Sequence, residues 1–149
     1  MEGGDEKIIG GAGQSAEEDL QRMRLFDGSS LEAYILGRRD EIKALLMDGA
    51  YILDISLTRV LSAVRDAEKS GKIDSSASEE LIQALSRIPF RRVGIKKHIK
   101  SALEISRMGM SAEKSLYLAV AKERGMELVT CDEEIGRAAK TLGIKCIII

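Results

Sequence analysis

The sequence predicts an α/β fold in which helices flank both faces of a central, mostly parallel sheet. Short apolar runs alternate with helical segments along the chain, and no two runs are joined by a turn typical of a β-hairpin. The chain of 149 residues is long enough to bury about two-thirds of the surface that its unfolded form exposes. We therefore expect one domain that needs no disulfide or structural metal.

The first 21 residues differ in composition from the rest of the chain. They are rich in glycine and in acidic residues, which favours a flexible tail. The predicted organisation is a flexible tail over residues 1–21, followed by a single domain over residues 22–149.

The first half of the domain is predicted to begin with an apolar strand at residues 23–26, which ends at Asp27. The serines that follow are positioned to cap a helix. A second helix over residues 39–47 leads to a short buried strand at residues 50–53. A third helix follows and ends near residue 71, because its apolar residues recur with a 3.6-residue period up to that point.

The second half of the domain is predicted to be mainly helical. A helix over residues 75–88 is stopped by the only proline of the chain, and a link over residues 90–93 follows it. The next helix, over residues 95–108, is expected to turn Ile95, Ile99, Leu103 and Ala102 inward. Another helix begins at Ser111 and ends at a glycine. The last stretch, residues 128–149, is predicted to form an apolar strand, a helix and a second apolar strand.

Composition and charge exclude several classes of protein. The net charge of -1 and the pI near 6.0 argue against polyanion binding driven by overall charge. No apolar run approaches the roughly 20 residues of a membrane span, so we expect a cytoplasmic protein without a membrane partner. Cys131 and Cys146 lie in apolar surroundings and are expected in the core. The absence of asparagine is typical of a heat-adapted source.

Two aspartates lie at junctions between a predicted strand and the helix that follows it. Asp27 follows the first apolar run, and Asp132 follows the apolar run in "LVTCDEEIGRAAKTLGIKCIII". Because polar sites of parallel sheets lie at the carboxyl ends of the strands, both side chains are expected to project into one crevice. The competing interpretation is that each aspartate only caps the helix that follows it.

Three stretches resemble the signatures of the PIN-domain family, in particular VapC-type toxin ribonucleases. They are "RLFDGSSL", "SLYLAVA" and "LVTCDEEIGRAAKTLGIKCI", and the resemblance spans roughly residues 23–149. It implies a PIN-like three-layer domain whose clustered carboxylates hold Mg²⁺ or Mn²⁺ for RNA hydrolysis. On these motifs the first and last catalytic acids fall on Asp27 and Asp132, supported by the hydroxyls of Ser29 and Thr130. Glu134 falls where some members add a carboxylate.

The two middle acids of the family are replaced by cations in this sequence. Alignment of the family motifs puts Arg59 and Lys114 at those positions. We expect these cations to pair with Asp27 and Asp132, because clustered carboxylates repel one another unless a cation lies between them. Replacing two anions by two cations changes the local charge from about -4 to about 0, so metal binding should be weak or absent. No cofactor is therefore expected unless the site is active, when Mg²⁺ or Mn²⁺ would be bound.

The leading functional prediction is a degenerate VapC-like protein that keeps RNA or partner binding and has lost most or all of its ribonuclease activity. An active endoribonuclease toxin, with Glu113 or Glu134 as a third metal ligand, is the first alternative. A dimerising interaction module is the second alternative. The two remaining acids alone do not decide whether the chain is an enzyme. The resemblance implies an antitoxin partner and a homodimer.

A basic segment follows the proline. Arg91, Arg92, Lys96 and Lys97 lie in a run without an acidic residue, which could grip an RNA backbone. The competing interpretation is a solvated surface. His98, which lies among these cations, is expected at the surface.

Overall fold

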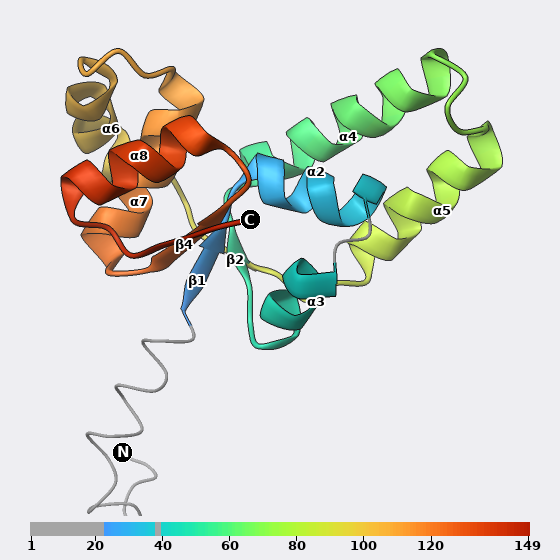
Figure 1. The fold of residues 1–149 in the computed structure, drawn as a ribbon, viewed down its shortest axis with the longest axis horizontal. Helices are drawn as coiled ribbons and strands as arrows, with labels where there is room; N and C mark the ends of the chain where they lie inside the picture. Colours follow the sequence, from blue (N-terminus) through green and yellow to red (C-terminus); the bar gives the residue numbers. More distant parts are fainter. Residues whose placement is uncertain (1–22, 38–39) are drawn as a thin grey trace, which may run out of the picture.

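A computed structural model describes residues 23–37 and 40–149, so the predicted tail over residues 1–21 lies outside the described residues. Five strands form one sheet in the order β3-β2-β1-β4-β5, and every neighbouring pair is parallel (Figure 1). The strands are β1 (Arg24–Phe26), β2 (Tyr51–Ile52), β3 (Arg91–Arg92), β4 (Glu127–Thr130) and β5 (Cys146–Ile148). The parallel sheet confirms the predicted α/β class.

Helices cover both faces of this sheet. One group, α2 to α5, lies on one side, and a second group, α6 to α8, lies on the other (Figure 1). The helices are α2 (Gly28–Gly37), α3 (Asp40–Met47), α4 (Asp54–Lys69), α5 (Ser75–Ser86), α6 (Ile99–Ser106), α7 (Ala112–Arg124) and α8 (Glu133–Leu142). A 3₁₀ turn, Lys96–His98, precedes α6.

The two central strands supply both halves of the core. Leu25 and Leu128 pack with the α6–α8 group, whereas Phe26 and Val129 pack with the α2–α5 group, and all four side chains are fully buried. This alternation follows from the two-residue period of a strand. It also explains why β1 and β4 carry apolar residues at consecutive positions, since both faces of these central strands are covered by helices.

Helices α4 and α5 project from the sheet side by side (Figure 1). The side chain of Asp74 caps α5 by accepting a hydrogen bond of 2.8 Å from the backbone N–H of Ala77. The predicted cap of α2 was wrong, because Asp27 and not a serine accepts the backbone N–H of Ser30, at 2.9 Å. The helix therefore begins at Gly28, directly after the strand.

The predicted inward face of α6 was wrong for two of its residues. Ile99 and Leu103 are 53% and 54% exposed, whereas Ala102 is buried as predicted and Ile105 completes the buried face. Ile95, which precedes the helix, packs against the core as predicted. The 3₁₀ turn before α6 has three residues per turn, so it shifts the helical period on which the prediction relied. His98 is also buried, contrary to expectation, and its Nδ1 lies 2.6 Å from Glu123 Oε1.

One strand was missed. β3 has only two residues, Arg91 and Arg92, and both are exposed, so no apolar run marks it in the sequence. Its backbone N–H groups nevertheless pair with β2, for example from Arg91 to the carbonyl oxygen of Ala50 at 2.9 Å. Within residues 23–37 and 40–149, no helix has the length and apolar character required to cross a membrane.

Candidate functional site

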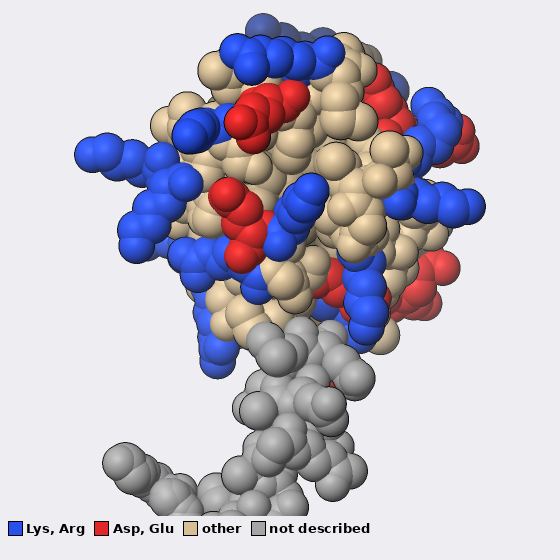
Figure 2. Space-filling view, turned by 90° about the vertical axis from the view of Figure 1, so that its left-hand side faces the viewer, with Lys and Arg blue, Asp and Glu red and all other residues tan. Residues whose placement is uncertain are grey.

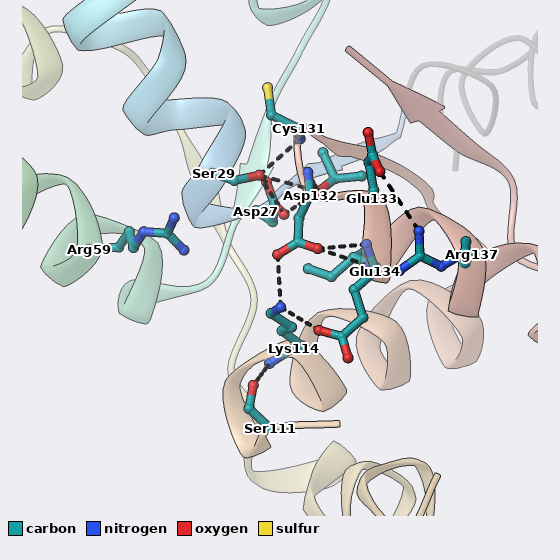
Figure 3. A network of polar contacts seen from close by, with 12 residues as sticks. Asp27, Ser29, Arg59, Ser111, Lys114, Cys131, Asp132, Glu133, Glu134 and Arg137 are labelled. Carbon is teal, nitrogen blue, oxygen red and sulfur yellow. Dashed lines mark hydrogen bonds and ion pairs between the residues drawn. The ribbon is translucent and has the colours of Figure 1, made fainter. Parts of the chain in front are cut away.

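Asp27 and Asp132 lie at the carboxyl ends of neighbouring strands. β1 and β4 pair so that Phe26 is opposite Val129, and each chain then turns into a helix. Asp27 stands between β1 and α2, and Asp132 stands between β4 and α8 (Figure 3). The structure therefore brings the two predicted acids to one edge of the sheet.

The carboxylate of Asp27 is enclosed by hydrogen-bond donors. Ser29 Oγ donates to both of its oxygens, at 2.8 and 2.9 Å, and the backbone N–H of Ser30 donates to Oδ1 at 2.9 Å. Thr130 Oγ1 donates to Oδ2 at 2.5 Å. Burial nevertheless raises the pKa of Asp27 above its ordinary value, because the side chain is only 1% exposed and these hydrogen bonds offset the desolvation only in part.

The same two hydroxyls tie the ends of the strands together. Ser29 Oγ accepts the backbone N–H of Cys131 at 2.9 Å, and Thr130 Oγ1 accepts the backbone N–H of Asp132 at 2.9 Å. The two oxygens lie 3.2 Å apart. Ser29 and Thr130 therefore both donate a hydrogen bond to Asp27, and the supporting role that the resemblance implies for them stays a prediction.

One carboxylate oxygen of Asp132 caps a helix, and the other pairs with a cation. Oδ1 accepts the backbone N–H groups of Glu134 and Ile135, at 2.8 and 3.1 Å, which caps α8. Oδ2 lies 3.0 Å from Lys114 Nζ, and the same ammonium group lies 2.5 Å from Glu134 Oε1 (Figure 3). The predicted pairing of Lys114 with Asp132 is present.

The pKa values of this ion pair move in opposite directions. Hydrogen bonds to Glu134 and then Asp132 raise the pKa of Lys114. Burial works to raise the pKa of Asp132, but the Lys114 ammonium and the backbone N–H groups at the start of α8 outweigh it and lower that pKa. Both shifts favour the charged forms, so the pair is ionised at neutral pH.

Arg59 reaches the crevice from α4, but its partner differs from the predicted one. Its Nε donates to Glu32 Oε1 of α2 at 2.9 Å rather than to Asp27. Its aliphatic stem packs on Gly28, where an added Cβ would lie 2.8 Å from Arg59 Cγ. Glu32 was missed in the sequence, because nothing in its neighbourhood distinguishes it from the other acids of exposed helix faces.

Glu113 lies close enough to the crevice for its charge to act on Arg59 and Tyr117. Burial works to lower the pKa of Arg59, but the Glu32 carboxylate outweighs it and raises that pKa, and the charges of Glu113 and Asp27 add to this effect. Burial also raises the pKa of Tyr117, one turn further along α7, whose hydroxyl lies 2.6 Å from Ser56 Oγ beneath the crevice. Tyr117 therefore belongs to the floor of the site.

Solved structures with the same arrangement of elements identify the fold. The structure of PAE2754 from Pyrobaculum aerophilum is 24% identical, with a TM-score of 0.66 over 83% of this chain and 89% of that chain. VapBC2 from Rickettsia felis, bound to a DNA fragment from their promoter, is 15% identical, with a TM-score of 0.60 over 85% and 98% of the chains. The chain has the PIN-like fold of the VapC toxins.

Two further structures share this PIN-like fold. A toxin–antitoxin complex from Klebsiella pneumoniae is 21% identical, with a TM-score of 0.54 over 74% of this chain and 88% of that chain. FitAcB from Neisseria gonorrhoeae is 12% identical, with a TM-score of 0.59 over 84% and 96% of the chains. No model of a known protein family and no curated protein matches the sequence significantly.

The acids of this PIN-like site do not fit a divalent ion as they stand. Within the described part of the chain, no three His, Cys, Asp or Glu side chains are grouped so that they could hold a metal. Both oxygens of Asp27 accept hydrogen bonds from Ser29, and Oδ2 of Asp132 faces the Lys114 ammonium. Mg²⁺ and Mn²⁺ require several free oxygen ligands, and here a cationic side chain stands among the oxygens.

The basic segment lies apart from this crevice. β3 is two strands from β1, which corresponds to about 10 Å at the usual strand spacing. Arg92 lies 3.5 Å from Asp54 at the start of α4, and Arg91 donates to the Tyr51 hydroxyl at 3.0 Å. Lys96 and Lys97 are exposed in the 3₁₀ turn. Figure 2 shows basic side chains spread around the α6–α8 side with acidic ones between them, not gathered into one patch.

Proposed function

We propose that this chain is a degenerate PIN-like protein in which two cationic side chains have disarmed a metal-dependent ribonuclease site. The observation that carries the proposal is the position of Lys114. Its ammonium group is bonded to Asp132 and Glu134. These are two of the four acids that could have served as metal ligands, and Asp27 and Glu113 are the others. A divalent ion would have to displace this ammonium group before it could reach the Asp132 oxygen.

Arg59, on the other side of the crevice, also weakens the attraction of the crevice for a divalent ion. Its guanidinium neutralises Glu32 and contributes positive charge near Asp27. Arginine remains protonated at every physiological pH, so this charge cannot be removed by titration. The crevice therefore offers a divalent ion little of the attraction that an unpaired group of carboxylates would provide.

An active Mg²⁺- or Mn²⁺-dependent endoribonuclease is the second candidate, and the position of Glu113 favours it. This carboxylate is half-buried and close enough to Arg59 to raise its pKa. With Asp27 and Asp132 it would supply a third ligand if Arg59 and Lys114 swung away. Glu134 is a weaker choice, because Lys114 holds its carboxylate at 2.5 Å.

The retained role in this proposal is binding of RNA or of a partner protein. The exposed cations of β3 and the 3₁₀ turn, which lie apart from the crevice, would provide phosphate contacts. A groove of about 900 Å³ between α2 and α4, bordered by Glu32 and Arg59, provides a surface for a second protein. An antitoxin is the partner suggested by the neighbours that were solved as toxin–antitoxin complexes.

Thermal unfolding in the presence of Mn²⁺ tests the disarmed site. The wild-type midpoint should stay within about 1 °C up to millimolar Mn²⁺, because a ligand stabilises a protein only when it binds the folded state. The double variant Arg59→Glu with Lys114→Asp should show a saturable rise. The matched control is Arg65→Glu with Lys122→Asp, which makes the same charge change at exposed positions of the same two helices.

The three proteins together separate the candidates. A saturable rise in the wild type would contradict the disarmed site and favour the endoribonuclease. A rise in the control equal to that of the double variant would attribute the effect to overall charge.

A further inference from the structure

A buried hydroxyl group lies beneath the crevice, between helices that carry the crevice residues. Tyr117 of α7 is 1% exposed, and its hydroxyl lies 2.6 Å from Oγ of Ser56, which is fully buried in α4. Burial raises the pKa of the Tyr117 hydroxyl, whereas Ser56 and the backbone N–H of Gly28, at the start of α2, work to lower that pKa. The hydroxyl therefore lies where α7, α4 and α2 meet.

Both partners of the bond between α7 and α4 lie one helical turn from a cation of the crevice. Lys114 precedes Tyr117 by three residues in α7. Arg59 follows Ser56 by three residues in α4. Residues three apart lie on the same face of a helix, so this bond fixes the two cation-bearing faces relative to each other.

The start of α2, the third element at this hydroxyl, is tied to the aspartates. Gly28 directly follows Asp27, whose carboxylate accepts a hydrogen bond from Thr130 at the end of β4. Asp132 is held at the same edge of the sheet, because its backbone N–H donates to Thr130 Oγ1 at 2.9 Å. The sheet thus fixes the two aspartates, and Tyr117 fixes the helices of the cations against them.

The hydroxyl acts on the crevice only indirectly. A side chain buried to this extent does not reach a ligand in the crevice. A phenylalanine at position 117 would fill nearly the same volume without the cost of burying a hydroxyl group, so the polar contact is what distinguishes tyrosine here.

We propose that Tyr117 is a positioning residue, whose hydrogen bond with Ser56 holds Lys114 at its contact distance from Asp132. It thereby maintains the ion pair that fills the crevice. The consequence for metal binding rests on the proposed function, whereas the positioning itself is a property of the wild-type chain.

NMR titration of side chains in the full-length protein tests the positioning. Tyr117→Phe removes only the hydroxyl, so Lys114 should lose its fixed distance from Asp132. The pKa of Asp132 should then rise toward its ordinary value, and that of Lys114 should fall, because each loses part of the other's charge. Tyr51→Phe is the matched control, since it removes a hydroxyl that accepts from Arg91 away from the crevice. It should leave both pKa values unchanged.

Ser56→Ala tests the same bond from its other end. It should shift the two pKa values in the same directions, and combining it with Tyr117→Phe should add little, because both changes remove one hydrogen bond. A lower thermal midpoint alone does not support the proposal, since a purely structural bond would have that effect as well. Unchanged pKa values in both variants, or equal shifts in Tyr51→Phe, would overturn the proposal.

Mn²⁺ binding separates this inference from the proposed function. Adding Tyr117→Phe to the Arg59→Glu, Lys114→Asp variant should weaken Mn²⁺ binding by about tenfold, as loss of groups that orient metal ligands does. Adding Tyr51→Phe should leave the affinity unchanged. Failure of the starting variant to bind Mn²⁺ would count against the proposed function alone, because the titrations of the wild-type chain involve no metal. Equal affinity with and without the Tyr117 hydroxyl would contradict its positioning role.

Discussion

At the scale of single residues, the two aspartates of the crevice have opposite environments. Asp27 is buried among neutral donors, and its pKa is raised. Asp132 faces an ammonium group and the start of a helix, and its pKa is lowered. The ionised form of Asp27 is thus disfavoured by burial, which its hydroxyl and backbone donors offset only in part, whereas the ionised form of Asp132 is stabilised by a cation and a helix start. Neither arrangement depends on a bound metal ion.

The burial of Asp27 predicts a pH-dependent effect of Asp27→Asn. Because its folded pKa lies above the ordinary value of 3.8, the folded state holds more protons than the unfolded state between these two values. The free energy of unfolding therefore falls as the pH rises through this window, and the ionised Asp27 carboxylate destabilises the folded state at neutral pH. Removing the charge should raise the thermal midpoint at pH 7, and the gain should shrink as the pH is lowered toward 3.8.

Thermal unfolding of the two proteins between pH 3 and pH 7 measures this effect. Asp66→Asn, on an exposed position of α4, serves as the control and should show no comparable gain. A lower midpoint of Asp27→Asn at pH 7 would mean that the ionised carboxylate stabilises the site.

Residue-level prediction from the sequence succeeded where a strand end fixed the position of the side chain. The convergence of Asp27 and Asp132 follows from the strands and their parallel pairing, whereas Thr130 was named only through the resemblance. The partner of Arg59 could not be predicted, because it depends on how α4 packs against α2, and the sequence gives no crossing geometry. The place of Glu32 in the site could not be predicted either, because it depends on the same packing of α4 against α2.

At the scale of elements, the basic segment joins a strand to a 3₁₀ turn. Arg91 and Arg92 belong to β3, and Lys96 and Lys97 belong to the turn. Their contacts with Tyr51 and Asp54 are exposed, and such pairs contribute about 0–1 kcal/mol, so RNA phosphates can compete for these cations. This surface was visible in the sequence as charge, but β3 was not, because its pairing is non-local.

Neutralising the segment should abolish RNA binding if the chain binds RNA there. Changing Arg91, Arg92, Lys96 and Lys97 to glutamine should remove binding of single-stranded RNA, measured by fluorescence anisotropy. The wild-type affinity for RNA should fall steeply with salt. The slope of log K against the logarithm of the salt concentration should scale with the number of phosphates that the protein neutralises. A control that changes Lys122, Arg124, Arg137 and Lys140 removes equal charge from α7 and α8. Equal losses in both variants would indicate attraction without a defined site.

At the scale of the whole molecule, the alternation of apolar runs and helices was sufficient to predict the fold. Consecutive apolar residues such as Leu128 and Val129 of β4 require burial on both faces, which a sheet between two helical layers provides. The orientation of α6 was not predictable in the same way, because a 3₁₀ turn shifts the helical period without a sequence signal. The α/β architecture thus follows from the hydrophobic pattern, whereas the proposed loss of metal binding rests on two side chains.

The central claim is that the side chains of Lys114 and Arg59 occupy the space that a metal ion would need and neutralise the carboxylates that would attract it. Anomalous scattering from crystals soaked in Mn²⁺ tests it most directly. We expect no anomalous peak between Asp27 and Asp132 in the wild type, and a peak there in the Arg59→Glu, Lys114→Asp variant. A wild-type peak coordinated by the oxygens of Asp27 and Asp132, with Lys114 turned away, would contradict the account.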